Sequence, residues 1–572
     1  MDSVKGLAVD LDVRVEMRDG VLLSTDIYRP AEGVWPALLL RTPYSKLQPP
    51  TMMASLDPIR AVREGFAVVI QDTRGRFDSE GEFSPFDEGE DGFDCVGWVA
   101  AQPWCDGNVG MFGSSYMAAT QLQAAAARPP ALKAICPVAG SSDYYEGRSY
   151  RGGALELGAL VTIALWALAR GAHVVDDSKP LNKRMAEVRN VLKEFDEFLS
   201  VRPLDSLRAT ILGEVAPFFF DWATHSNADD YWSHISLEEK YPNFDVAALH
   251  VTSWFDQFHV GTLRNYEGLH ASAGTQDSRD AQALVVGPWA HFSPRSTMVG
   301  SVRVGDVNFG LDALVDLEIM QMRWFRKYLK GSAGSWRNAT PVRLFMMGEN
   351  RWHDEESWPV KDVDVEPLFL GANGQLSWEP ATDSGSATYV FDPRNPVPTF
   401  GGAHLVLESL YPTGPIDHQH QPARDDVLVY NSTTLSEPVE IVGWVEANLF
   451  IRSDCPSTDF TVKLLDVWPD GRILNVVDGI RRVSGADKPD ESGWLAVRVE
   501  MGATAIRLLE GHRIQVHISS SNFPRFDVNS NTGESLLTAT ETAIARQTLC
   551  QGGPYGSYIL LPVRRAGGQS VT

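Results

Sequence analysis

The chain has 572 residues, of which 44% are hydrophobic and 22% charged, and its formal net charge is −24. A single hydrophobic core stops growing near about 250–300 residues, so this length predicts two or three domains. The acidic excess argues against nucleic acid and anionic membranes as partners, because binding to phosphates requires clustered Lys and Arg.

Cysteine use and the apolar runs indicate where the protein works. The five cysteines are far apart or lie in apolar runs and form no CxxC pair, which predicts free thiols in a reducing compartment. Residues 1–20 lack the basic and apolar regions of a signal peptide. The longest apolar run, at 157–168, is too short to span a bilayer. We therefore expect a cytoplasmic protein; whether it forms a homo-oligomer stays open.

The first part of the chain predicts a parallel sheet. Up to residue 141, apolar runs such as "GFAVVIQDTRG" and "LKAICPVAG" alternate with helical segments, which is typical of strands covered on both faces. Residues 142–245 have helical periodicity instead and predict an inserted lid or pocket wall. The strand pattern resumes over 246–345. The α/β domain is therefore expected to be split between 1–141 and 246–345.

The last part of the chain, 346–572, predicts a separate β domain. Segments such as "VEIVGWVEANLFIRSD" and "HRIQVHISSS" alternate apolar and polar residues between turn signals. Short strands at this spacing are typical of a β-sandwich or jelly roll.

Two adjacent serines mark a candidate catalytic turn in "NVGMFGSSYMAATQ". A nucleophilic serine on a tight strand-to-helix turn needs small neighbours. Gly113 stands two places before Ser115, whereas Phe112 stands two places before Ser114, and this comparison selects Ser115. Met117 replaces the second glycine of the usual motif, so the assignment needs support from elsewhere in the chain.

That support comes from the ends of two later predicted strands. Asp256 follows the apolar run "ALHVTSWF", and His291 follows "LVVG". They lie 141 and then 35 residues further along the chain, in the order Ser, Asp, His that α/β-hydrolases use. Because parallel strands end at the same edge of a sheet, the three side chains are expected to meet there as a catalytic triad.

Long motifs across the chain resemble the bacterial serine hydrolases of the cocaine-esterase type. They are "RTPYSK", "VVIQDTRGRFDSEGEF", "WCDGNVGMFGSSYMA", "SWFDQF", "LVVGPWAH", "VRLFMMGENRWHDEESWP" and "SSNFPRFDVNSNTG". The resemblance implies an α/β-hydrolase core, a helical insertion and a carboxyl-terminal jelly roll. It also implies that Ser115 is the nucleophile, His291 the base and then the acid, and Asp256 the orienting carboxylate. The Tyr116 N–H and the Tyr44 hydroxyl would form the oxyanion hole.

The substrate is less defined by the sequence. In the amino-acid-ester branch of this family, acidic residues follow the triad aspartate, but here Gln257, Phe258 and His259 do. Phe258 matches an aromatic position that lines the acyl pocket in the cocaine-esterase branch. Further candidates for pocket walls are Trp166, Leu405 and Val406. An apolar, aromatic pocket favours a bulky aromatic or alicyclic ester.

These observations predict a serine carboxylesterase that forms an acyl-enzyme on a small-molecule ester. An amidase, an acylase or an Xaa-Pro-type peptidase with the same triad is the alternative, and a non-catalytic binding protein is a third. No metal or organic cofactor is expected, since the triad supplies base and nucleophile itself. The loop 527–533 and the pair His418 and His420 resemble metal ligands only superficially, and we interpret them as a capped turn and a polar loop.

Overall fold

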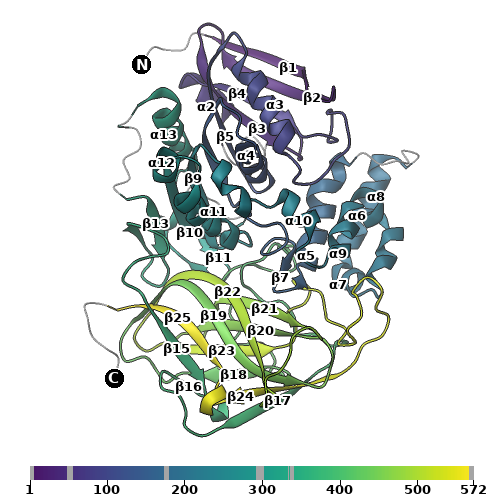
Figure 1. Cartoon of the computed structure of the whole chain (residues 1–572), viewed down its shortest axis with the longest axis vertical. Helices are drawn as coiled ribbons and strands as arrows, with labels where there is room; N and C mark the ends of the chain where they lie inside the picture. The colour runs from purple at the N-terminus through teal and green to yellow at the C-terminus, as the bar shows by residue number, and fades with distance from the viewer. Residues whose placement is uncertain are drawn as a thin grey trace.

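The computed structural model describes residues 6–47, 56–172, 179–291, 302–332, 334 and 340–565. It consists of a mixed α/β domain, a helical insertion on one side of it and a β domain beneath both (Figure 1). The described chain begins in the α/β domain, at the top of this view, and ends in the β domain, at the bottom.

The α/β domain is built on one sheet whose strand order is β1-β2-β4-β3-β5-β6-β9-β10-β13-β14. Neighbouring strands from β4 to β13 run parallel, and the two edges are antiparallel. The strands are β1 (Leu7–Glu16), β2 (Leu22–Pro30), β3 (Trp35–Thr42), β4 (Ala67–Asp72), β5 (Cys105–Ser114), β6 (Leu132–Val138), β9 (Ala247–Phe255), β10 (Gln282–Ala290), β13 (Val342–Met346) and β14 (Arg351–Glu355).

The inner strands of this sheet are buried on both faces, as the apolar runs predict. Alternate residues of β3 enter different cores: Leu38 and Leu40 pack in one, Ala37 and Leu39 in the other. A strand that is buried on both faces needs an uninterrupted apolar run, and "ALLL" supplies it. The helices of this domain are α2 (Pro58–Arg63), α3 (Gly89–Ala100), α4 (Tyr116–Ala126), α11 (His259–Ser272), α12 (Gln276–Asp280) and α13 (Leu317–Lys330).

The insertion is helical, as its periodicity predicts. It leaves the sheet after β6 and returns at β9, with the small hairpin β7 (Tyr150–Arg151) and β8 (Ala154–Leu155) at its start. Its helices are α5 (Leu157–Thr162), the π-helix η1 (Ile163–Leu168), η2 (Ala169–Gly171), α6 (Leu181–Lys193), α7 (Phe195–Leu199), η3 (Leu204–Ala209), α8 (Ile211–Val215), α9 (Phe218–Thr224), α10 (Asp230–Ile235) and η4 (Glu238–Asn243).

The β domain consists of two antiparallel sheets within the described residues, in the orders β16-β15-β25-β19-β24-β17, with β22 also on β19, and β18-β23-β20-β21. Its strands are β15 (Asp364–Leu370), β16 (Leu376–Ser377), β17 (Gly385–Phe391), β18 (Leu428–Asn431), β19 (Val439–Ser453), β20 (Thr458–Val467), β21 (Ile473–Val483), β22 (Leu495–Leu508), β23 (Arg513–Ser519), β24 (Ala545–Gln551) and β25 (Tyr558–Arg564). The short elements β11 (Arg303–Val304), β12 (Val307–Asn308), η5 (Leu311–Ala313), η6 (Ala372–Gly374) and η7 (Gly553–Tyr555) complete the described chain.

Buried charges join the insertion to the β domain. Arg525 is fully buried, and its guanidinium contacts Asp478 of β21 at 2.7 Å and Glu156, just before α5, at 3.4 Å. Removing one partner would leave an uncompensated buried charge, which costs about 3–5 kcal/mol. The insertion is therefore held firmly against the β domain at the point where α5 begins.

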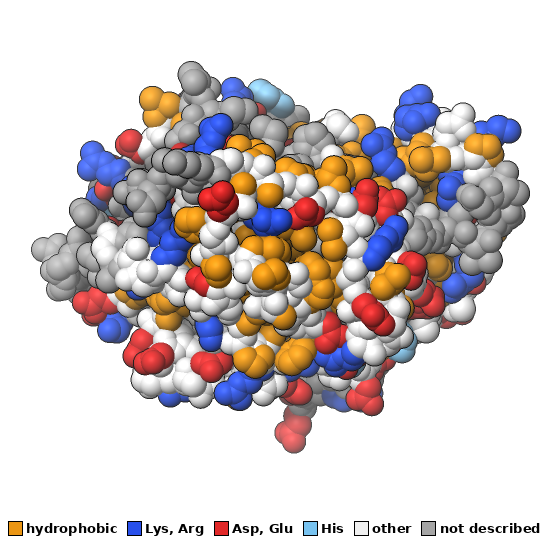
Figure 2. Space-filling view, turned by 90° about the horizontal axis from the view of Figure 1, so that it is seen from above, with side chains coloured by type: hydrophobic (Ala, Val, Ile, Leu, Met, Phe, Trp, Pro, Cys, Tyr) orange, Lys and Arg blue, Asp and Glu red, His pale blue; other side chains and the backbone are white. Residues whose placement is uncertain are grey.

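Acidic and basic side chains are mixed on the surface of the α/β domain, where they surround a central group of apolar ones (Figure 2). The acidic side chains are therefore not clustered on the face that this view shows. None of the helices that the structure describes is long and apolar enough to cross a membrane.

Candidate active site

Ser115 lies on a sharp turn between β5 and α4. It is the N-cap of α4 and has φ 61° and ψ −122°, a strained conformation for a residue with a side chain. Gly113 has φ 130°, and a Cβ there would lie 2.5 Å from the Met117 Cβ and 2.7 Å from Leu40. Only glycine therefore fits two places before Ser115. Met117, which replaces the expected second glycine, is buried in the core, and the turn forms around it.

The three residues predicted as a triad come together at the carboxyl edge of the sheet. The His291 Nε2 lies 3.1 Å from the Ser115 Oγ, and its Nδ1 lies 2.9 Å from the Asp256 Oδ2. The other Asp256 oxygen accepts the Phe258 N–H at 2.9 Å. Asp256 is fully buried, and His291 is 9% exposed. A carboxylate in this position keeps the histidine in the tautomer whose Nε2 can accept a serine proton.

His259 holds the turn that carries Asp256. Its Nδ1 lies 2.7 Å from the Asp256 carbonyl oxygen, and its Nε2 accepts the Ala503 N–H of β22 at 3.4 Å. Burial lowers the pKa of His259 to about 4, so its ring is neutral at pH 7 and can donate from one nitrogen and accept at the other. The β domain thereby braces the loop that carries Asp256.

Two groups that can donate a hydrogen bond lie beside Ser115, the Tyr116 N–H and the Tyr44 hydroxyl. Tyr116 is the first residue of α4, so its N–H has no intrahelical acceptor. Burial raises the pKa of Tyr44 to about 12, against an opposing effect of the Ser115 side chain, so this phenol keeps its proton at pH 7. A preorganised donor of this kind is worth about 2.7–4 kcal/mol in the transition state.

The Tyr116 hydroxyl is held by Glu88 and by the backbone of Phe86. It donates to the Glu88 Oε1 at 2.9 Å and accepts the Phe86 N–H at 2.9 Å. Burial raises the pKa of Glu88 to about 7, although Arg41 lies 2.8 Å from this carboxylate. The sequence analysis did not identify Glu88, because no local motif links it to a residue 28 positions away.

A narrow pocket opens beside Ser115, with a volume of about 20 Å³, which is room for one water molecule. Its described walls are Tyr44, Phe86, Tyr116, Ala119, Ala139, Ser141, Tyr144, Arg148, Ile163 and Phe258. Phe258, a predicted wall residue, also packs edge-on against the His291 ring at 5.4 Å between centroids. Arg148 and Ile163 were not identified from the sequence.

The other predicted wall residues occupy different positions. Leu405 is buried in a small apolar cluster with Phe258, against which Ile163 packs, but it is not among the described walls of the pocket. Val406 is buried, and it lies 3.0 Å from where a Cβ on Gly158 would be. Trp166 does not line the pocket: its side chain is 56% exposed. Ile163, three residues before Trp166, lines the pocket instead. It begins the π-helical stretch Ile163–Leu168, whose register cannot be read from the sequence.

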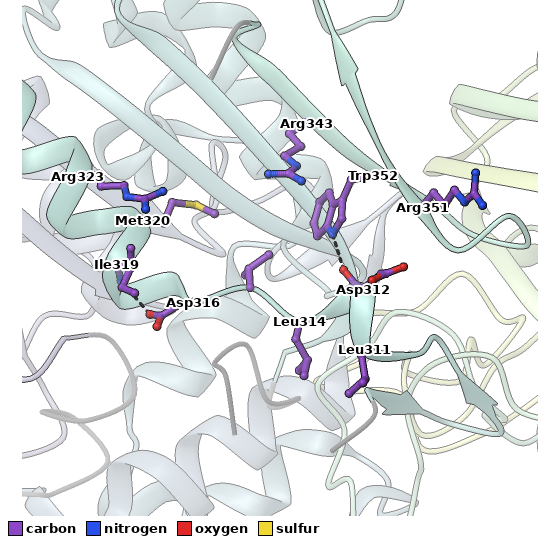
Figure 3. Close-up of a pocket in the computed structure, with 11 residues that line it drawn as sticks. Leu311, Asp312, Leu314, Asp316, Ile319, Met320, Arg323, Arg343, Arg351 and Trp352 are labelled. Carbon is purple, nitrogen blue, oxygen red and sulfur yellow. Dashed lines mark hydrogen bonds between the residues drawn. The ribbon is translucent and has the colours of Figure 1, made fainter. Parts of the chain in front are cut away.

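A larger pocket, of about 920 Å³, lies elsewhere in the α/β domain (Figure 3). Trp352 donates from its indole to the Asp312 carbonyl at 2.7 Å, and Asp316 caps α13 at the Ile319 N–H. None of the predicted site residues lies among its described walls, so we assign it no part in the chemistry.

A serine, a histidine and a carboxylate that are linked by hydrogen bonds in this order, on an α/β-hydrolase sheet, define a serine hydrolase. The comparisons with known proteins agree. Residues 19–293 match the family model of X-Pro dipeptidyl-peptidases (S15 family), and residues 335–560 match the X-Pro dipeptidyl-peptidase C-terminal non-catalytic domain. The chain belongs to this family of serine hydrolases.

Individual relatives span nearly the whole chain. The cocaine esterase of Rhodococcus sp. (strain MB1 Bresler) is 38% identical over 97% of this chain and 98% of its own. A solved α-amino-acid ester hydrolase is 26% identical, with a TM-score of 0.80 over 99% of this chain and 98% of its own. A solved aminopeptidase from a Thaumarchaeota archaeon is 24% identical, with a TM-score of 0.77 over 98% and 97%, and shows the shared fold.

Proposed function

We propose that the protein is a carboxylesterase that works through an acyl-enzyme on Ser115. His291 accepts the Ser115 proton at Nε2 while the serine oxygen attacks the ester carbonyl. The negative charge that forms on the carbonyl oxygen is stabilised by the Tyr44 hydroxyl and the Tyr116 N–H. His291 then protonates the departing alcohol, which leaves the acyl group on Ser115. A water molecule, deprotonated by His291, releases the acid and restores the serine.

The observation that carries this proposal is the continuous contact from nucleophile to carboxylate. The His291 Nε2 lies 3.1 Å from the Ser115 Oγ, and the His291 Nδ1 lies 2.9 Å from the Asp256 Oδ2, which is the order that the mechanism requires. These distances are already within the range that proton transfer requires. The fully buried Asp256 can also stabilise the imidazolium that forms during attack.

The charge of the pocket bears on the substrate. Among its described walls, Arg148 alone is ionised at pH 7, and no carboxylate is present. An acyl group with a free ammonium would therefore meet a cation and no counter-charge. This favours acyl groups without an ammonium over the amino-acid acyl groups that amino-acid-ester hydrolases and aminopeptidases are named for. The relative from Rhodococcus is named an esterase, which is consistent with an ester as the substrate of this protein.

The aromatic walls Phe86, Tyr144 and Phe258 support an acyl group with a ring, which stacks well on such surfaces. A volume of about 20 Å³ does not hold a ring, however. Binding of a bulky aromatic or alicyclic acyl group therefore requires the walls to move apart.

A panel of methyl esters tests the function: benzoyl, cyclohexanoyl, butanoyl and aminoacyl esters, each against its matched amide. We expect hydrolysis of the esters without an ammonium, and at least about 10³-fold lower kcat in Ser115→Ala. Ser114→Ala is the matched control, because it removes the neighbouring hydroxyl and leaves the triad intact. Amides hydrolysed faster than esters would establish the amidase alternative. Full activity in Ser115→Ala would overturn the proposal.

A further inference from the structure

Arg148 is a buried cation at the wall of the catalytic pocket that the mechanism does not use. It lies between β6 and β7, at the start of the insertion, and is 2% exposed. It lines the same pocket as Ser115, Phe258 and Ile163. A buried charge at a binding pocket requires an explanation, because removal from water costs several kcal/mol.

Arg148 lacks the acidic partner that Arg41 and Arg525 have. Arg76 is also buried with no ion pair among the described residues, but its guanidinium donates to the Pro43 and Leu168 carbonyls. The Arg41 guanidinium lies 2.8 Å from Glu88, and that of Arg525 lies 2.7 Å from Asp478. Over the part of the chain that the structure describes, no carboxylate lies within ion-pair distance of Arg148. Its side chain donates one hydrogen bond there, from Nη1 to the Ser149 hydroxyl at 2.9 Å.

Aromatic rings hold the guanidinium in place. Its central carbon lies 4.4 Å from the ring centroid of Phe86 and 4.3 Å from that of Trp222 on α9. Each such contact is worth about 0.5–2 kcal/mol, which offsets only part of the cost of burial. The Arg148 carbonyl accepts the Gln257 side-chain N–H at 3.2 Å, next to the triad aspartate. The cation is therefore fixed both to the insertion and to the catalytic loop.

The remaining N–H groups of Arg148 are suited to a carboxylate. A guanidinium presents its donors in a planar fork that binds both carboxylate oxygens at once. Burial lowers the pKa of Arg148 to about 10, so it still carries its charge at pH 7. An anion bound in the pocket would supply the counter-charge that the protein itself omits, in surroundings where water weakens the attraction little.

We propose that Arg148 binds a carboxylate on the acyl part of the substrate, so that the preferred substrates are monoesters of dicarboxylic acids. The proposal rests on the proposed esterase function. The acyl side is indicated because Arg148 lines the same pocket as Ser115 and Phe258, and the Phe258 ring packs against that of His291.

The test compares esters that differ only in this charge. The monomethyl esters of succinate, glutarate, adipate and terephthalate are assayed against methyl butanoate, pentanoate, hexanoate and 4-methylbenzoate. We expect kcat/KM for the best monoanion to exceed that of its neutral partner by on the order of 10–100-fold, as for a charge-assisted hydrogen-bonded pair. Arg148→Met should remove this preference, so that kcat/KM for each monoanion falls toward that of its neutral partner, whereas Arg148→Lys should retain part of it.

Arg208→Met is the matched control. Arg208 also lies over an aromatic ring, Phe220, at 4.4 Å, but it is on the surface and pairs with Asp205. This variant should keep the preference for monoanions. Should Arg148→Met fail to fold, the wild-type preference and competitive inhibition by the free dicarboxylates decide the question.

Two results would overturn the proposal: equal or lower kcat/KM for the monoanions, or an equal loss on charged and neutral esters in a folded Arg148→Met. Each can occur with Ser115-dependent hydrolysis of neutral esters intact. The esterase proposal fails separately, when Ser115→Ala keeps the wild-type rate.

Discussion

The two walls of the catalytic pocket are built in different ways. One wall is the carboxyl edge of the central sheet, where Ser115, Asp256 and His291 follow strands β5, β9 and β10 directly. The other is the insertion, where Arg148 and Ile163 reach the pocket from a loop and a π-helix. The sheet edge carries the proposed chemistry, and the insertion wall carries the proposed specificity.

The difference lies in what fixes each side chain. A parallel sheet brings the ends of its strands to one edge, so the chemistry depends on backbone topology. The insertion side chains are positioned by packing between parts of the chain far apart in sequence, such as Arg148 against Trp222. Substitutions in the first wall should therefore reduce kcat for every substrate, whereas those in the second should change the choice among substrates.

The largest expected effect lies in the sheet edge. Asp256→Asn keeps the side-chain volume but favours the wrong tautomer of His291, so kcat should fall by about 10⁴-fold for all esters. Steady-state kinetics over the ester panel, with circular dichroism to confirm folding, provides the measurement. A loss limited to some substrates would contradict the division of roles between the walls.

A smaller effect is expected for the oxyanion donor. Tyr44→Phe removes one hydroxyl from the sheet side of the pocket, and kcat should fall about 10²–10³-fold with KM little changed. Pre-steady-state measurement of the acylation rate isolates the step in which the oxyanion forms. An unchanged acylation rate would remove Tyr44 from the mechanism.

The smallest effect compares two positions of the insertion. Ile163→Ala enlarges the pocket, and we expect kcat/KM for benzoyl relative to butanoyl esters to change by about 10-fold, which corresponds to 1.4 kcal/mol. Trp166 lies three residues after Ile163 and is exposed, so Trp166→Ala should leave this ratio within about 2-fold of wild type. The ratio of kcat/KM values is the readout. The reverse pattern would place Trp166 in the binding wall after all.

The same division explains what could be predicted from the sequence. Continuous apolar runs specify strands buried on both faces, so the sheet and the meeting of Ser115, Asp256 and His291 were predictable. The absent second glycine was harmless, since Gly113 alone relieves the turn and Met117 packs in the core.

The insertion wall was less predictable. An apolar helix such as 157–168 does not reveal which residues face a cavity, and its π-helical stretch shifts the register, so Trp166 was expected where Ile163 lies. Arg148 belongs to none of the sequence motifs described above. Its place depends on Phe86 and Trp222, contacts that only the folded chain brings together.

The most direct test of the account is covalent labelling of the nucleophile. The intact protein is treated with a fluorophosphonate, and its mass and the modified peptide are determined by mass spectrometry. We predict one adduct per chain, located on Ser115, present in Ser114→Ala and absent in Ser115→Ala. An adduct on another residue, or equal labelling of Ser115→Ala, would contradict the assignment of Ser115 as the nucleophile.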